Sequence, residues 1–439
     1  MVRGAWSHAS RSGIMHVTKR PLRQARPIPA RRRRIPRARP RLRAPVATLL
    51  LTLLAFLAPD LTLAPNIAVQ PAAITATAVD PDAAAPSLGL EPNDRRTAGW
   101  ALPQGAAPSP SADPPSRPDP EAFERALGAA RARGGAHGVS FAVVRDGELL
   151  WSGSSGRARD GRTTLDGEAP MVIGSVTKTF VAAAALQLVE EGRLGLDDRV
   201  RDHLPELRRL SRRITVAQLL DHTSGLADLF NDTTRRGLED DPAHAWTADE
   251  VLGSLRSPWY EPGEGWAYAN TNYYLLGMIV ERLSEASLAE VLGERFLEPL
   301  GLDGTRVLTG VEGDPLEPAW TTIFWASGAM AAPASDLARW GDALYRGGVL
   351  DPASRAAMLT MNRHHYGYGV QEIEIGRRTG YGHTGLLNTY TSLLLHLPDE
   401  GLTLALLVNR SHVDLAAMLR AKPAGGSSLL NLALGDQSP

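Results

Sequence analysis

A chain of 439 residues, of which 43% are hydrophobic, can bury a large core, so disorder throughout the chain is excluded. Residues 1–43 hold fourteen lysines and arginines and no acidic residue, which leaves residues 44–439 with 33 basic and 48 acidic residues; a body with a net charge of −15 would repel nucleic acid. The absence of cysteine excludes disulfide bonds, a thiolate nucleophile and cysteine-ligated metals.

The first segment has the pattern of an export signal. The uncharged run 46–58 (VATLLLTLLAFLA) follows the arginine-rich stretch and precedes Pro59 and Asp60. A spanning helix needs about 20 apolar residues, so this shorter run favours the hydrophobic region of a cleaved signal peptide, with a retained anchor as the alternative. Residues 1–64 are therefore predicted to be a basic leader and signal peptide or anchor, and the protein to be exported, either extracellular or in the cell envelope.

A linker and the start of a folded domain follow. Residues 65–119 are rich in Ala, Pro, Asp and Ser without periodicity, which predicts a disordered linker. Residues 120–135 (PEAFERALGAARARGG) show helical spacing, and two strand-like runs then flank Asp146-Gly147, a tight-turn signal. The folded domain is predicted to span residues 120–425 and to be followed by a tail at 426–439.

Helical and strand patterns then occupy separate parts of the domain. Helical spacing dominates from Ser175 to about Leu300, including 215–226 (TVAQLLDHTSGL), and recurs at 334–348. Strand patterns follow between 366 and 409, and a closing helix is expected at 413–421. Strands at both ends with helices between them predict an α/β (α+β) fold, in which an antiparallel sheet is flanked by helices and carries an inserted helical lobe.

Ser175 and Lys178, at the start of a long apolar helix, are candidates for a nucleophile and its base. Three residues are about one helical turn, so the lysine amine can reach the serine hydroxyl. Lysine occurs only at Lys19, Lys178 and Lys422, and Lys178 interrupts an apolar stretch. Burial would bring its pKa toward neutrality, and the N–H groups of the helix start would favour an oxyanion. The alternative is a helix cap followed by a solvated lysine.

Two further patterns face the groove expected between sheet and lobe. Tyr268 and Asn270 lie on a loop, where the tyrosine could relay protons if neighbouring cations lowered its pKa from about 10, and the asparagine could hold a substrate amide and the lysine amine. His383 and Gly385 share one face of a predicted strand, where the glycine would let a substrate backbone approach. Each pattern alone is more often structural, as a packed aromatic with an N-cap or as a core histidine.

Together, the Ser-x-x-Lys, Tyr-x-Asn and His-x-Gly patterns, in this order, resemble the serine D-alanyl-D-alanine carboxypeptidases and class C β-lactamases, which are penicillin-binding serine hydrolases. The resemblance includes GSVTKTF, LLDHTSGL, PGEGWAYANTNYYLLG, ASGAMAAPASDLARW and GYGHTG, and it covers roughly residues 120–420. It implies a β-lactamase/transpeptidase-like fold. It also implies that Ser175 attacks a carbonyl while Lys178 and Tyr268 share general-base and general-acid duty.

The resemblance implies binding roles as well. Asn270 would orient the substrate amide, the strand 383–386 (His383, Thr384, Gly385 and Leu386) would bind substrate, and the backbone N–H groups of Ser175 and Leu386 would form an oxyanion hole. The family commonly has a hydroxyl at the position of Leu386 that helps to bind a carboxylate, so leucine disfavours a free C-terminal carboxylate. Class C β-lactamases commonly have lysine at the position of His383, so histidine favours a peptidase or esterase.

Other polar positions receive weaker predictions. His222 is expected to be structural, with Asp221 capping or pairing with it, and Arg377 and Arg378 are candidates for a carboxylate-binding charge. The pair His364-His365 has no partner at metal-ligand spacing, and neither a phosphate loop nor a dinucleotide motif occurs. Neither a metal nor an organic cofactor is predicted.

The sequence thus predicts an exported serine hydrolase that forms an acyl-enzyme at Ser175 and acts on cell-wall peptides in the manner of a D-alanyl-D-alanine carboxypeptidase. One alternative is a β-lactamase-like esterase, and the alternative from another class is a non-catalytic β-lactam-sensing or wall-binding protein. The expected partner is a peptide, β-lactam or ester, with no nucleic acid. The chain is predicted to be a monomer that contacts a membrane only through an N-terminal anchor.

Overall fold

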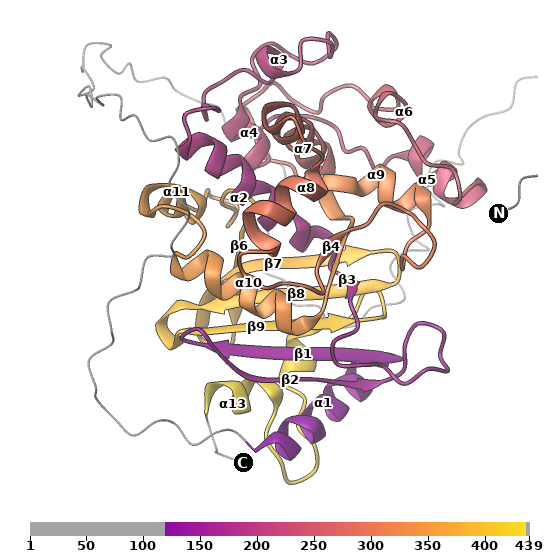
Figure 1. The fold of residues 1–439 in the computed structure, drawn as a ribbon, viewed down its shortest axis with the longest axis vertical. Coiled ribbons are helices and arrows are strands. Elements are labelled where there is room, and N and C mark those ends of the chain that lie inside the picture. Colours follow the sequence, from indigo (N-terminus) through magenta and orange to yellow (C-terminus); the bar gives the residue numbers. More distant parts are fainter. Residues whose placement is uncertain (1–118, 436–439) are drawn as a thin grey trace, which may run out of the picture. The chain divides into compact units, whose positions relative to one another are not determined.

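The computed structural model describes residues 119–435, and its central element is a six-stranded antiparallel sheet (Figure 1). The strand order is β2-β1-β9-β8-β7-β6, so the first and last strands of the domain pair in the middle of the sheet. The strands are β1 (Gly138–Arg145), β2 (Glu148–Gly156), β6 (Gln371–Ile375), β7 (Arg378–Leu387), β8 (Tyr390–Leu397) and β9 (Leu402–Val408). This arrangement confirms the predicted sheet.

The central strand β9 is buried on both faces, which explains its nearly continuous apolar sequence. Leu404 and Leu406 point into a core shared with helix α1 (Pro120–Gly134). Ala405 and Leu407 belong to the larger core on the opposite face. Since side chains alternate along a strand, this single strand holds two cores together.

One face of the sheet is covered by both ends of the domain. Helix α1 packs with α12 (Leu415–Leu419) and α13 (Leu429–Leu434) in one apolar cluster. Helix α13 falls within the predicted tail at 426–439. Its residues Leu429, Leu430 and Ala433 are nevertheless buried in this cluster. The domain therefore continues beyond the expected boundary at 425.

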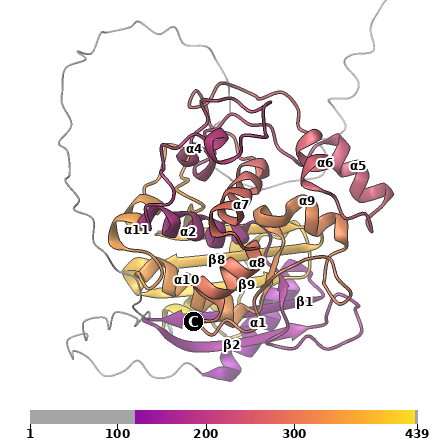
Figure 2. The same cartoon turned by 45° about the horizontal axis from the view of Figure 1, so that its top comes forward.

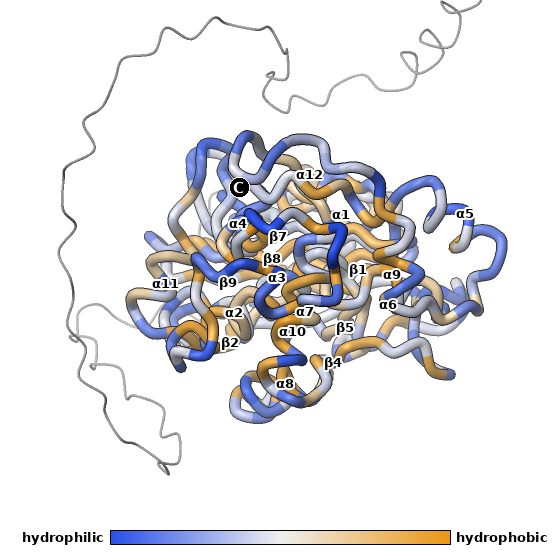
Figure 3. Tube along the Cα trace, turned by 90° about the horizontal axis from the view of Figure 1, so that it is seen from above, coloured by the Kyte–Doolittle hydropathy of each residue, from blue (hydrophilic) through white to orange (hydrophobic). Residues whose placement is uncertain are grey.

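The other face carries α10 (Ala334–Arg346) and the helical lobe, as Figure 2 shows from a second direction. The lobe contains the following helices: α2 (Thr177–Glu190), α3 (Val200–His203), α4 (Val216–Leu220), α5 (Asp232–Asp240), α6 (Ala248–Gly253), α7 (Asn270–Ser284), α8 (Leu288–Leu292), α9 (Pro318–Gly328) and α11 (Pro352–Met358). Helix α2 is almost completely buried. In Figure 3 hydrophobic residues gather in the interior around β1 and α10, whereas α5 at the edge is mainly hydrophilic.

Two parts of the lobe differ from the sequence prediction. The helix expected over 215–226 ends at Leu220, because His222 and Gly225 adopt left-handed backbone conformations with φ of 65° and 78°. Helix α9 and a small sheet of β3 (Met171–Val172), β5 (Met330–Ala332) and β4 (Arg306–Val307) were not predicted. Strands of two or three residues are too short to produce a recognisable alternation.

Candidate active site

Ser175 lies on a tight turn that leads directly into α2. The turn is a single 3₁₀ segment, Gly174–Val176, and Gly174 has φ of 52°. A Cβ atom at Gly174 would lie 2.8 Å from the backbone nitrogen of Leu386, so glycine is required both for the backbone angle and for this close approach. The turn thereby places Ser175 beside strand β7.

Strand β7 is held against this turn by a second glycine. A Cβ atom at Gly385 would collide with the carbonyl oxygen of Ile173 and with the hydroxyl of Ser392. That hydroxyl donates a hydrogen bond to the same carbonyl at 2.7 Å. Gly385 therefore serves first in packing β7 onto the nucleophile turn, and this packing creates the groove in which a substrate backbone could lie.

Lys178 is fully buried one helical turn after Ser175. Its Nζ atom lies 3.0 Å from the Ser175 Oγ, 2.8 Å from the Asn270 Oδ1 and 2.7 Å from the carbonyl oxygen of Ser327. Burial lowers the pKa of Lys178 to about 7, and the charge of Asp228 opposes this shift. The lysine can therefore exchange a proton near neutral pH.

The three contacts of Lys178 determine where its lone pair points when the amine is neutral. A neutral amine has two N–H donors and one lone pair, and the amide oxygen of Asn270 and the carbonyl of Ser327 can only accept. Only the hydroxyl of Ser175 can donate, so the lone pair faces the serine proton. This arrangement can remove the proton of Ser175 when its oxygen attacks a carbonyl.

Ser327 reaches the lysine because α9 is distorted near its end. Trp325 has φ of 20° and ψ of −113°, which are not helical, and Ser327 lies in the last turn, where carbonyls lack helical partners. The amine of Lys178 satisfies this carbonyl. Sequence reasoning assigned Ser327 no role, since a backbone carbonyl leaves no signature in the residue type.

Tyr268 is placed beside the pair but differs from the prediction in its ionisation. Its hydroxyl is buried and makes no hydrogen bond of standard geometry within the described residues, and the Lys178 Nζ lies 4.8 Å from the centre of its ring. Burial raises the pKa of Tyr268, and the nearby hydroxyl of Ser175 offsets only part of this rise. The condition stated above for a proton relay, a pKa lowered by neighbouring cations, is not met, because loss of solvent dominates. Tyr268 therefore keeps its proton at neutral pH.

His383 is also buried, and its two nitrogens are both engaged. Nδ1 lies 2.6 Å from the carbonyl oxygen of Thr384, so it must carry the proton and donate, while Nε2 lies 3.0 Å from the hydroxyl of Tyr366 and accepts from it. The pKa of His383 is lowered to about 3, mainly by burial and in part by the charge of Lys178. At neutral pH this histidine therefore contributes no positive charge to the groove.

Beyond Tyr366 the hydrogen bonds continue to His222. The side-chain N–H of Asn272 and the backbone N–H of Ala269 donate to Nδ1 of His222 at 2.8 and 3.3 Å, so its Nε2 carries the proton and donates to Tyr366 at 3.2 Å. The contacts of His222 are thus those of a structural residue. Asp221 does not pair with it and instead accepts from Thr223.

A cavity of about 610 Å³ lies beside Ser175. Its wall includes Ser175, Tyr268, Asn270 and His383, and the described part of this wall contains no Arg, Lys, Asp or Glu. It is lined further by a second histidine, His412, and by Trp266, Phe324, Ser327, Gly328, Gln371, Leu387, Thr391, Val413, Leu415 and residues 384–386. Leu386 is 45% exposed, so the groove presents an apolar surface beside the nucleophile.

The two arginines proposed for a carboxylate do not reach this cavity. Arg378 begins β7 at the opposite end from Gly385, and its Nε pairs with Glu400 at 2.6 Å. Arg377 is exposed in the turn before it. The prediction that they supply charge to the groove is wrong, because the strand carries them away from Ser175.

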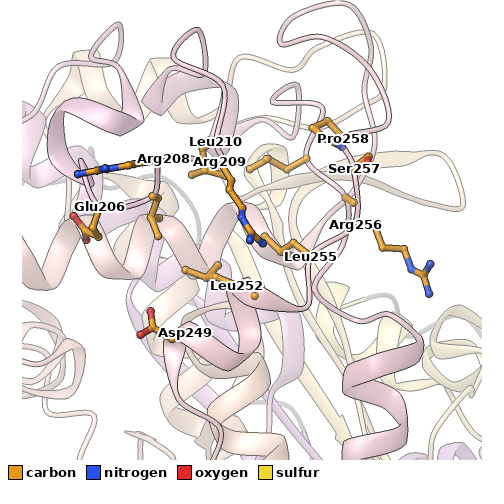
Figure 4. Close-up of a pocket in the computed structure, with 14 residues that line it drawn as sticks. Glu206, Arg208, Arg209, Leu210, Asp249, Leu252, Leu255, Arg256, Ser257 and Pro258 are labelled. Atoms are coloured by element: carbon orange, nitrogen blue, oxygen red, sulfur yellow. The ribbon is translucent and has the colours of Figure 1, made fainter.

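A cavity of about 650 Å³ in the helical lobe is shown in Figure 4. Its wall carries Arg208, Arg209 and Arg256 around several leucines, and it includes none of the predicted site residues. Among the described residues of its wall there is no lysine or histidine, and the carboxylate of Glu206 is paired with Arg282. The paired groups around Ser175, not cavity size, therefore identify the candidate active site.

The antiparallel sheet with its helical lobe and the Ser175–Lys178 pair at their junction define a class, the serine hydrolases of the penicillin-binding type. The family model described as Beta-lactamase matches residues 123–424, which is more than half of the chain. The chain therefore belongs to this family, and the predicted family and fold are confirmed.

Similar proteins differ in the activities that their names give. Penicillin-binding protein 4 of Amycolatopsis lactamdurans is 28% identical over 320 residues, covering 62% of this chain and 80% of the relative. D-aminopeptidase of Brucella anthropi is 28% identical over 346 residues, and the match spans 69% of this chain but only 60% of that enzyme. The structure of a D-stereospecific amidohydrolase from Streptomyces sp. aligns with a TM-score of 0.60 at 29% identity, covering 71% of this chain and all of that one.

Proposed function

We propose that this serine hydrolase cleaves amide bonds in short substrates containing D-amino acids, through an acyl-enzyme on Ser175. The contacts of Lys178 carry the proposal, because a desolvated amine whose other two partners only accept leaves its lone pair for the Ser175 proton. The D-specificity is suggested by the similarity to a D-aminopeptidase and a D-stereospecific amidohydrolase.

In the proposed reaction the Ser175 oxygen attacks the carbonyl carbon while Lys178 takes the serine proton. The backbone N–H groups of Ser175 and Leu386 would hold the resulting oxyanion. Tyr268, which keeps its proton at neutral pH, would protonate the leaving nitrogen and be reprotonated from Lys178. Water would then release the acyl group with the same residues in reversed roles.

The residues in the cavity wall favour a substrate with an uncharged group next to the scissile bond. Next to Ser175 a free carboxylate would meet Leu386 and a neutral His383; the described part of the wall holds no arginine or lysine, and His412 is its second histidine. A carboxylate that loses its water without a partner binds poorly. A substrate with an uncharged leaving amide therefore fits this side of the groove better than the terminus of a D-alanyl-D-alanine peptide.

The D-alanyl-D-alanine carboxypeptidase predicted from the sequence remains the second candidate, supported by the similarity to penicillin-binding protein 4. An esterase would use the same acyl transfer and the same uncharged groove. Export to the cell envelope also remains a proposal: it depends on the run 46–58, which lies outside the described residues. Within residues 119–435 no helix is long and apolar enough to cross a membrane.

The test compares D-phenylalaninamide, a D-alanyl-D-alanine peptide, a p-nitrophenyl ester and benzylpenicillin as substrates of the purified chain. Turnover is followed by product release, and the acyl-enzyme by intact mass. The proposal expects the amide to be turned over faster than the peptide, with all activity lost in Ser175→Ala. Faster cleavage of the D-alanyl-D-alanine peptide would establish the second candidate. A penicillin adduct that persists, without turnover of any substrate, would identify the non-catalytic sensor.

A further inference from the structure

A carboxylate that the sequence patterns did not indicate lies directly behind the proposed catalytic groups. Asp228 follows the His222 turn, and its Oδ1 accepts from the backbone N–H groups of Asn270 at 3.1 Å and Phe230 at 3.2 Å. Its Oδ2 accepts from the Nδ2 of Asn270 at 3.2 Å. Both oxygens thus bind N–H donors, and two of these three hydrogen bonds hold Asn270.

The contact with Asp228 determines which end of the Asn270 amide faces the lysine. An amide side chain can present either its oxygen or its nitrogen in the same space, and a carboxylate accepts but cannot donate. Because Nδ2 is bound to Asp228, Oδ1 is directed to the Nζ of Lys178 at 2.8 Å. The opposite orientation would bring two oxygens together at Asp228 and two donors together at Lys178.

We infer that Asp228 is a positioning residue for acyl transfer: it orients Asn270 so that the lysine must donate to the amide and keep its lone pair for Ser175. This inference rests on the proposed acyl-enzyme at Ser175. It assigns Asp228 a role through Asn270 and Lys178, without contact to substrate, and Asp228 is not part of the cavity wall.

The charge of Asp228 provides a second, measurable effect. Burial raises the pKa of Asp228, and its N–H donors and Lys178 oppose that rise by favouring the carboxylate. This charge raises the pKa of Lys178 and so opposes the larger effect of burial. The other titratable groups around the amine are uncharged at neutral pH: burial holds the pKa values of His222 and His383 below the usual value and those of Tyr268 and Tyr273 above it. Asp228 is therefore the charge whose removal should be felt at Lys178.

The variant Asp228→Asn tests this inference, because it preserves the shape and removes the charge. Without the charge the pKa of Lys178 falls, so the acid limb of kcat/KM should move to lower pH, while the plateau drops roughly ten- to hundredfold because the amide is no longer oriented. Adding Asn270→Asp to this variant puts a carboxylate next to the amine, and the acid limb should then move to higher pH than in the wild type.

Asp221→Asn is the matched control. Asp221 is a partly buried carboxylate on the same loop that binds Thr223, and the pKa shift of Lys178 comes from burial and Asp228. Its loss should leave the acid limb unchanged even if stability falls. Equal shifts in the two variants would assign Asp228 a merely structural role and overturn the inference.

A measurement without catalysis separates this inference from the proposed function. The chain has three lysines, so labelling lysine with ¹³C at Cε gives a simple spectrum in which Lys178 is assigned by Lys178→Arg. A lower pKa of Lys178 in Asp228→Asn, but not in Asp221→Asn, supports the inference. If no substrate is turned over in that case, the proposed function is wrong while the inference about Asp228 stands. An unchanged pKa in Asp228→Asn overturns it, whatever the activity.

Discussion

Lys178 and His383 are two buried bases near one groove, and their environments give them opposite properties. Burial lowers the pKa of both, to about 7 for Lys178 and to about 3 for His383. Lys178 contacts two groups that can only accept and one hydroxyl that can also donate. Both ring nitrogens of His383 are engaged, by Tyr366 and by the carbonyl of Thr384, so neither is left to donate or accept a proton. Burial thus makes a base available, and the hydrogen-bond partners decide whether it can react.

The largest effect should come from removing the reactive base. Lys178→Met keeps an unbranched side chain but has no base, so the rate of acylation should fall by about 10²–10⁴-fold, measured by burst kinetics or intact mass. Lys422 is an exposed lysine, and Lys422→Met should be silent.

His383→Gln completes the comparison in the same assay. A neutral amide can replace a neutral imidazole, so the expected loss of acylation is about tenfold. A loss as large as that of Lys178→Met would contradict the assignment of His383 as an unreactive group.

The chain of hydrogen bonds that holds His383 should appear in stability. Tyr366→Phe leaves buried imidazole nitrogens without a partner and should lower the free energy of unfolding by about 1–3 kcal/mol in a denaturant titration. Tyr345→Phe is the control, because the hydroxyl of Tyr345 is buried without a hydrogen-bond partner among residues 119–435 and its removal should cost little. Equal losses in both variants would mean that the hydrogen bonds to His222 and His383 contribute nothing.

The last prediction concerns the groove edge. Leu386→Thr adds a hydroxyl beside Ser175 and should improve kcat/KM for a D-alanyl-D-alanine peptide relative to the amide by about tenfold. An unchanged ratio would mean that the residue at 386 does not select for or against a carboxylate.

Much of the site could be predicted because its elements are local. Ser175 and Lys178 are one helical turn apart, and His383 and Gly385 share a strand face, so spacing alone brings each pair together. The sheet and most helices followed from periodicity in the same way. The α13 helix was missed because its apolar residues form too short a pattern to be distinguished from a tail.

By itself, the sequence determined which side chains are available and which neighbours share a face, since helix and strand geometry depend on nearby residues. Only the tertiary structure decided their chemistry. Lys178 meets Asn270 and Ser327, which are 92 and 149 residues away in the chain, and Asp228 orients the amide from a loop with no regular pattern. The raised pKa of Tyr268 and the neutral state of His383 follow from loss of solvent. This loss depends on the packing of the whole domain, which no local sequence pattern reveals.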